Sequence, residues 1–108
     1  MDEAMEETCF GLIAASGTAR SQAFEALRAA KAHDMKEARR LLAASKESAI
    51  EAHHRQTELI SREAAGEHAE VSVILVHAQD HLMCSMLAQE LITELVDIYD
   101  LIPATVVA

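Results

Sequence analysis

The sequence predicts an all-α protein, an antiparallel up-down-up bundle of three long helices. Its composition favours helices, because Ala, Glu and Leu dominate the 108 residues while Gly occurs three times and Pro once. Apolar residues recur at steps of three and four along three stretches of about thirty residues each, which is the spacing of one helix face. Short connections between these stretches make neighbouring helices antiparallel. We therefore expect residues 1–108 to form a single domain.

The first helix is expected to run from about Asp2 to Ala32. One apolar stripe follows its inner face, and a second stripe lies beside the first. The first stripe consists of Met5, Cys9, Leu12, Ser16, Ala19, Ala23, Ala26 and Ala30, and the second of Phe10, Ile13, Gly17, Phe24 and Leu27. Gly17 and the alanines let a neighbouring helix approach closely, although Gly17 also weakens the helix by roughly 1 kcal/mol relative to Ala.

A break at residues 32–34 precedes the second helix, which is expected to span Met35 to about Ala65. Asp34 is a good N-cap, and Glu37 stands three residues later, close to the pattern of a capping box. Gly66 is placed to end this helix in a left-handed conformation. The inner face is expected to carry Ala38, Leu41, Leu42, Ser45, Ala49, Ala52, Gln56, Leu59 and Ile60.

The third helix is expected to begin after a cap at Ser72 and to continue to about Ile102, where Pro103 stops it. Residues 103–108 are expected to form a loose tail. This helix is apolar nearly all round, and two neighbours in a bundle cannot cover it. An uncovered apolar surface predicts association, and closed symmetry places one helix from each copy near a shared axis. The expected seam for a partner helix consists of Val73, His77, Asp80, Cys84, Leu87, Leu91, Leu95, Ile98 and Ile102.

Charge and cysteine content exclude several classes of function. Nine Lys and Arg against eighteen Asp and Glu give a net charge of −9, which argues against a nucleic-acid partner and against anionic membrane surfaces. The acidic N-terminus is unlike a signal peptide, and the longest apolar runs are far short of a membrane span. We therefore expect a cytoplasmic protein with no direct membrane insertion. Cys9 and Cys84 are too few for a disulfide framework, so buried free thiols are expected at both positions.

Two histidines and a carboxylate (His77, His81 and Asp80) interrupt the apolar third helix within the run Val76-His77-Ala78-Gln79-Asp80-His81-Leu82-Met83. Buried polar groups need partners, so this helix either uses them or hides them against another surface. On the seam, Asp80 would meet its own copies, and carboxylates brought together repel one another. A cation among them, protonation, or a solvated placement would each relieve that repulsion.

Four interpretations of the histidines can be compared. His77, Asp80 and His81 have a spacing that resembles an inverted zincin motif with Asp in place of Glu. Zincins also need a third ligand and a substrate-cleft domain, and a chain this small offers little cleft. Glu51 and His54 have the Glu-x-x-His spacing of di-iron bundles, but no second such motif occurs. A reactive histidine that carries a phosphoryl group needs mainly positioning and charge neutralisation. The plainest interpretation is a pair of core histidines bonded to Gln or Asp.

The remaining polar residues are assigned by position along the chain. His33 and His68 fall at the connections, so both are expected to be exposed to solvent. His53 follows the inner face of the second helix and is expected to pack against the third. Gln56 lies on that face and needs hydrogen-bond partners, which the polar run of the third helix could supply. Arg20 of the first helix is either a surface cation or an anion-binding group, and the surface cation is favoured.

Several segments match one known family in register. They are Gly17-Thr18-Ala19-Arg20-Ser21, then Glu51-Ala52-His53-His54-Arg55-Gln56-Thr57 followed by Glu63-Ala64-Ala65-Gly66-Glu67, and the run from Val76 to Met83. With these segments, the chain from about Glu6 to Tyr99 resembles the IIA component of the lactose/cellobiose (N,N′-diacetylchitobiose) class of the bacterial sugar phosphotransferase system (PTS). The last segment is the most specific of them.

The resemblance implies a phosphocarrier that assembles as a homotrimer of three-helix protomers. It implies that His77 is phosphorylated on Nε2 (the tele nitrogen) by HPr and passes the group to a cysteine of the cognate IIB component. It also implies that Asp80 of all three subunits binds a metal, with one magnesium ion per trimer on the threefold axis. Gln79 and His81 match positions that flank the active site, where supporting roles are expected.

The same resemblance implies a role in the uptake of a β-linked disaccharide of the lactose, cellobiose or chitobiose class. The sequence does not reveal which sugar is transported. The alternative from a different class is a non-enzymatic helical oligomerisation or adaptor protein that retains the fold. That alternative would better fit a chain without the histidine, and His77 is present.

Overall fold

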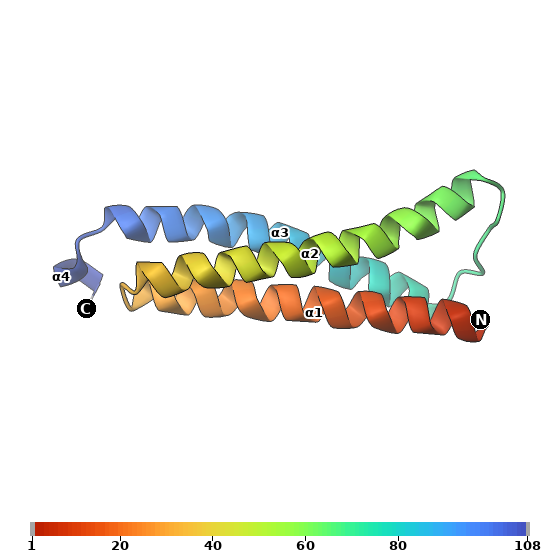
Figure 1. Ribbon diagram of the computed structural model, residues 1–108, viewed down its shortest axis with the longest axis horizontal. Coiled ribbons are helices and arrows are strands. Elements are labelled where there is room, and N and C mark those ends of the chain that lie inside the picture. Colours follow the sequence, from red (N-terminus) through yellow and green to blue (C-terminus); the bar gives the residue numbers. More distant parts are fainter. Residues whose placement is uncertain (1, 108) are drawn as a thin grey trace.

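Three long helices form one elongated up-down-up bundle, as predicted (Figure 1). The computed structural model describes residues 2–107 and the side chains of residues 2–105. The helices are α1 (Glu3–Lys31), α2 (Met35–Ala64) and α3 (Val73–Leu101), and the bundle measures 56 × 20 × 18 Å. The predicted tail contains a single helical turn, α4 (Ala104–Val107), while Ala108 lies outside the described residues.

Side-chain caps fix where each long helix begins. Asp2 accepts a hydrogen bond from the backbone N–H of Met5 at 2.7 Å, and Ser72 accepts one from the N–H of Leu75 at 3.2 Å. Asp34 likewise caps α2 by accepting from the N–H of Glu37 at 3.3 Å. These bonds satisfy backbone donors that have no partner within the helix. The predicted starts of the three helices are therefore correct to within one residue.

The expected capping box at the start of α2 is only half formed. The Glu37 carboxylate does not return to Asp34 but accepts a hydrogen bond from Arg40 Nε at 2.8 Å. That bond with Arg40 holds the pKa of Glu37 below its usual value. The Glu37 carboxylate therefore bonds to the Arg40 guanidinium instead of to the backbone N–H of Asp34, as a complete capping box would require.

The two connections each contain one residue in the left-handed backbone region. Gly66 has φ +92° directly after α2, as predicted for a glycine that ends a helix. His33 has φ +60° in the turn between α1 and α2, which is uncommon for a residue with a side chain. His33 is also half-buried rather than fully exposed, so the expectation for this residue was wrong.

The core lies between α1 and the inner faces of the other two helices. All eight residues of the first predicted stripe of α1 are buried. Two buried hydroxyls bond across helices: Ser45 Oγ donates to the carbonyl of Ala19 at 2.7 Å, and Ser85 Oγ donates to the carbonyl of Ser16 at 2.8 Å. Small residues at these crossings let the helices pack closely, and each hydroxyl finds a backbone acceptor.

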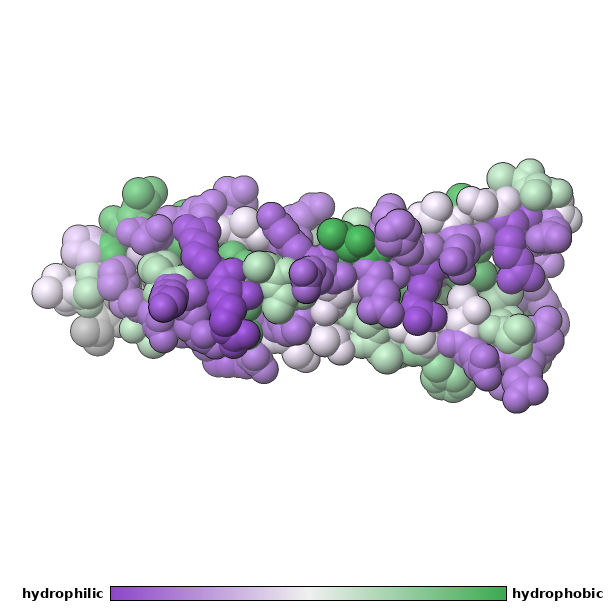
Figure 2. Space-filling model, viewed as in Figure 1, coloured by the Kyte–Doolittle hydropathy of each residue, from purple (hydrophilic) through white to green (hydrophobic). Residues whose placement is uncertain are grey.

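Several apolar residues expected to pack inside the bundle lie on its surface instead. Phe10 is 57% exposed on α1, and Ile60 is 58% exposed on α2. The face that α1 and α2 present to the viewer in Figure 2 is nevertheless mainly hydrophilic, with apolar side chains only in separate patches. None of the helices within the described residues is long and apolar enough to cross a membrane.

The largest set of exposed apolar side chains belongs to α3. Its buried positions are Ala78, Leu82, Ser85, Gln89, Ile92 and Val96, which face the bundle core. On the opposite side Leu87, Leu91 and Ile98 are each more than half exposed. We call the exposed residues Val73, Val76, Asp80, Met83, Cys84, Leu87, Leu91, Leu95 and Ile98 the α3 stripe.

Candidate functional site

His77 lies on the exposed side of α3, close to the helix N-terminus. Its ring contacts that of His81, one helical turn later, with the centroids 4.5 Å apart and the planes at 71°. This edge-to-face arrangement restricts how the His77 ring can turn. An open hollow of about 690 Å³ adjoins it, lined by Val71, Ser72, Val73, Val76, His77 and Asp80. A partner molecule can therefore reach the His77 ring from solvent.

The core-histidine interpretation does not describe these two residues. His77 is exposed and His81 is half-buried. Within the described residues, neither ring has a hydrogen bond to a Gln or Asp side chain. A histidine whose ring is accessible and lacks a bonded partner is available for chemistry with another molecule.

Asp80 lies on the α3 stripe, one helical turn before Cys84, and is itself exposed. The Cys84 thiol donates to Asp80 Oδ1 at 3.5 Å, a weak bond. This bond and the charge of Asp80 raise the pKa of the Cys84 thiol. Cys84 is exposed, so the expectation of two buried thiols was correct only for Cys9.

Arg20 and Phe24 of α1 border the same side of α3. The Arg20 guanidinium lies 5.6 Å from the centroid of the Phe24 ring, a cation–π arrangement. Both residues are exposed, so the Arg20 guanidinium lies on the surface, where it can also meet an anion. With them, Asp80, His81, Cys84 and Ala88 line a second hollow. The flank of α3 that carries His81 therefore faces α1.

The structure assembles no metal site from a single chain. Among the described residues, no three His, Cys, Asp or Glu side chains come close enough to hold one ion. The zinc and di-iron arrangements therefore do not form within the described chain. Asp80 contributes only one carboxylate per chain, so any ion bound there would need ligands from further copies.

Gln79 occupies the other flank of α3 and bonds to α2. The amide Nε2 of Gln56 donates to Gln79 Oε1 at 2.7 Å, and Gln56 is only 9% exposed. The expected partner of Gln56 is thus found in the polar run of α3. Residues two apart on a helix point about 200° apart, so Gln79 and His77 lie on opposite flanks of the same helix. The supporting role expected for Gln79 is not tested by its position within a single chain.

The histidines of α2 and of the second connection lie away from His77. His53 is exposed beside a hollow between α2 and α3, so it does not pack into the bundle as expected. His68 is exposed, as predicted, and its Nδ1 lies 2.8 Å from Glu63 Oε1. This bond, together with one from the backbone N–H of Ala69, lowers the pKa of Glu63.

Comparison with known proteins gives relatives of one kind along almost the whole chain. The family model for the lactose/cellobiose-specific IIA subunit of the PTS matches residues 7–100. The lichenan-specific phosphotransferase enzyme IIA component of Bacillus subtilis is 45% identical over 100 residues, covering 93% of this chain and 91% of its own. The N,N′-diacetylchitobiose-specific EIIA component of Escherichia coli is 48% identical over 102 residues, covering 94% and 88% respectively.

Solved structures agree with this assignment in fold and sequence. The PTS cellobiose-specific enzyme IIA from Bacillus anthracis has a TM-score of 0.89 at 50% identity, over 93% of this chain and 92% of that chain. A solution structure of an Escherichia coli IIA(Chitobiose)–HPr complex has a TM-score of 0.78 at 47% identity, over 93% of this chain and 96% of that chain. Both the family model and the curated relatives cover far more than half of the sequence, and the chain belongs to the lactose/cellobiose-specific IIA subunit family of the bacterial sugar phosphotransferase system.

Proposed function

We propose that this protein is a PTS phosphocarrier that accepts a phosphoryl group from HPr on Nε2 of His77 and passes it to a cysteine of the cognate IIB component. This transfer of phosphoryl groups would drive uptake of a β-linked disaccharide of the lactose, cellobiose or chitobiose class. Family membership supports this role, as does the relative whose solution structure includes HPr. The observation that carries the proposal is an exposed histidine ring on the exposed side of α3, next to an open hollow.

Phosphoryl transfer requires the protein mainly to position the His77 ring toward its partner. The lone pair of His77 Nε2 attacks the phosphorus of phosphorylated HPr, so a new P–N bond forms as the P–N bond to the HPr histidine breaks. In the second step a thiolate of IIB attacks the same phosphorus, a P–S bond forms, and His77 returns to a neutral imidazole. Positioning and charge stabilisation provide most of the acceleration in such transfers. An exposed surface suits two successive protein partners.

His81 is the supporting residue with the clearest contact to the carrier. Its edge-to-face packing against His77 limits rotation of the ring that must present Nε2. Gln79 is also assigned a supporting role, although it lies on the opposite flank of the helix. Neither residue needs to take up the phosphoryl group itself.

We assign the α3 stripe to the interface of a homotrimer. The stripe places several half-exposed apolar side chains along most of one helix. A monomeric soluble protein rarely exposes so large a continuous apolar surface. A cyclic trimer would bury the stripes of three copies around one axis. The three Asp80 carboxylates would then approach one another near that axis.

A magnesium ion on the threefold axis of the proposed trimer matches the oxygen ligand that Asp80 of each chain supplies. Carboxylate oxygens are the ligands that Mg²⁺ prefers, and the single exposed Asp80 of each chain would provide one. The ion would neutralise repulsion among the carboxylates and so support assembly. In this proposal the ion takes no part in phosphoryl transfer.

Labelling by HPr that carries a radioactive phosphoryl group tests the proposed function. Wild type is expected to gain one acid-labile label per chain, and His77→Ala none. His54→Ala removes an exposed histidine of α2 and serves as the control, with labelling equal to wild type. Circular dichroism should show that all three proteins are folded. Acid-labile labelling of His77→Ala would contradict the assignment of His77.

A further inference from the structure

Arg20 on α1 and Glu90 on α3 are exposed residues of opposite charge. Among the side chains of residues 2–105, no carboxylate lies within ion-pair distance of Arg20, and no cation lies within that distance of Glu90. Four other arginines, by contrast, each pair with a carboxylate of the same chain: Arg39, Arg40, Arg55 and Arg62. The Arg20 guanidinium instead lies over the Phe24 ring, 5.6 Å from its centroid, which leaves its N–H edge free to bind a carboxylate.

These two charges border opposite flanks of the α3 stripe. Arg20 lines the hollow on the side of α1, together with Ala88 of α3. Glu90 lines the hollow between α2 and α3, together with Met86. At roughly 100° per residue, Ala88 projects about 80° to one side of Asp80, and Glu90 projects about 80° to the other. The body of α3, about 10 Å wide with its side chains, therefore separates Arg20 from Glu90 within one chain.

A ring of copies around the α3 stripe brings the two flanks together. In a cyclic ring each contact is heterologous, so the flank of α3 that faces α1 meets the flank that faces α2 in the next copy. Rotation about the axis moves no copy along it, so side chains at one level of α3 meet those at the same level of the neighbour. Ala88, beside Arg20, is only two residues from Glu90, or about 3 Å along the helix. Arg20 of one copy therefore lies level with Glu90 of the next.

We propose that Arg20 of each copy forms an ion pair with Glu90 of the neighbouring copy, so that the surface beside Glu90 docks a second copy of this chain. This inference rests on the proposed trimer and makes no use of phosphoryl transfer. The two charges are complementary, and a planar guanidinium can donate two parallel hydrogen bonds to one carboxylate.

The ion pair determines how the apolar stripes associate. Apolar side chains attract one another in several registers and in either relative direction, so they do not specify one arrangement by themselves. In an antiparallel pair of α3 helices like flanks meet, and Arg20 lies away from the partner's Glu90. Only a parallel ring of unshifted copies aligns every Arg20 with a Glu90. The pair therefore contributes direction and register to an interface whose stability comes from apolar burial.

Cross-linking without a spacer tests the contact directly. A water-soluble carbodiimide joins an amine to a carboxylate with which it forms an ion pair. Arg20→Lys supplies the amine, because the guanidinium of wild type does not react. We expect covalent dimers and trimers on a denaturing gel, with mass spectrometry showing position 20 joined to Glu90. Wild type and the double variant Arg20→Lys, Glu90→Gln are the controls, and neither should give this link.

Exchanging the charges tests whether the pair joins different copies. Arg20→Glu and Glu90→Arg each place like charges at every interface, so the concentration at which half the trimer dissociates should rise at least about tenfold. The double variant should recover the wild-type midpoint. Co-expressed Arg20→Glu and Glu90→Arg chains should form mixed trimers that survive dilution better than either variant alone, because all but one of their interfaces pair opposite charges. A pair within one chain would recover in the double variant but not in the mixture.

Lys36→Glu makes the same change in charge at the exposed start of α2 and should leave the dissociation midpoint unchanged. If wild type is trimeric but position 20 gives no link to Glu90 between chains, or if Arg20→Glu and Lys36→Glu dissociate alike, the inference is wrong while the trimer stands. A monomeric wild type would overturn the proposed trimer and this inference with it. Labelling of His77 by phosphorylated HPr is measured separately, so loss of the ion pair is distinguished from failure of the phosphocarrier role.

Discussion

Gly11 and Gly17 occupy the same helix but differ in the space around them. A Cβ added at Gly17 would meet no atom within 4 Å, whereas one at Gly11 would lie 2.7 Å from Nη1 of Arg55. We expect Gly17→Ala to raise the free energy of unfolding by about 0.5–1 kcal/mol, because alanine stabilises a helix interior. Gly11→Ala should raise the free energy of unfolding by less, because the Arg55 guanidinium must move to make room for the new Cβ. Urea unfolding of both variants measures the difference, and destabilisation by Gly17→Ala would contradict open space at that position.

Exposure of single residues was the least predictable feature at this scale. The period of α3 placed Cys84 on an apolar seam, and it does lie among exposed apolar residues rather than in the core. A periodic pattern indicates which residues share a face, but not whether that face meets the same chain or another. The first stripe of α1 was predicted in full, and all eight of its residues are buried within the bundle.

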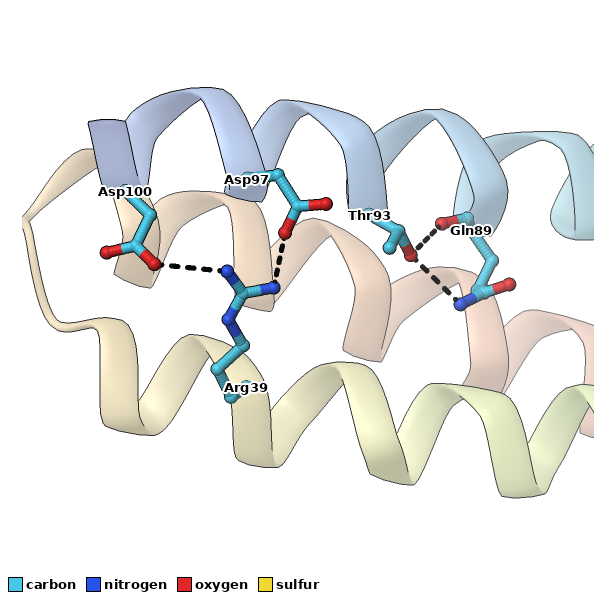
Figure 3. Close-up of polar contacts among 5 residues, drawn as sticks. All are labelled: Arg39, Gln89, Thr93, Asp97 and Asp100. Carbon is cyan, nitrogen blue, oxygen red and sulfur yellow. Dashed lines mark hydrogen bonds and ion pairs between the residues drawn. The ribbon is translucent and has the colours of Figure 1, made fainter. Parts of the chain in front are cut away.

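At the scale of elements, Arg39 connects the start of α2 to the end of α3 (Figure 3). Its two terminal nitrogens bond Asp97 at 2.6 Å and Asp100 at 3.2 Å. Acidic residues near a helix C-terminus are unfavourable, and the last turn of α3 contains no basic residue. The Asp97 and Asp100 bonds raise the pKa of Arg39, and the guanidinium offsets their charge at the helix end.

We therefore expect Arg39→Gln to lower the free energy of unfolding by roughly 0.5 kcal/mol, since the groups are half exposed. The loss should shrink as salt is raised, because exposed charges are screened. Thermal unfolding at low and high salt provides the measurement. Arg40→Gln removes an ion pair within α2 only and is the control for general charge effects. An equal loss in both variants at every salt concentration would show that the bridge between helices adds nothing.

The helix boundaries were predictable because their signals are local. Asp2, Asp34 and Ser72 each cap the helix that follows, and Gly66 adopts the left-handed conformation expected after α2. The left-handed His33 was not predictable, since no glycine marks the position. Its conformation is accompanied by turn bonds such as that from the N–H of Asp34 to the carbonyl of Ala29. Contacts within the folded turn, rather than residue preference, determine it.

At the scale of the whole molecule, Asp80 is the polar residue within the α3 stripe. If three copies bring their Asp80 carboxylates together, replacement by a residue of similar size removes the repulsion and fills the space with apolar atoms. We expect Asp80→Leu to remain trimeric and to melt at the same or a higher temperature, because buried charges are often less favourable than well-packed apolar groups. Sedimentation and thermal unfolding in the presence of a chelator test this. A monomeric or less stable variant would count against Asp80 on the axis.

The stripe itself can be tested by placing a charge in its centre. Leu91 is 56% exposed on α3, and Ile50 is 59% exposed on α2, so the two positions have nearly equal access to solvent in one chain. We expect Leu91→Lys to dissociate the trimer, because three ammonium groups would be buried around one axis without partners. Ile50→Lys lies off the stripe and should leave assembly intact. Sedimentation velocity over a range of concentrations separates the two results. A trimeric Leu91→Lys protein would show that the copies meet through another surface.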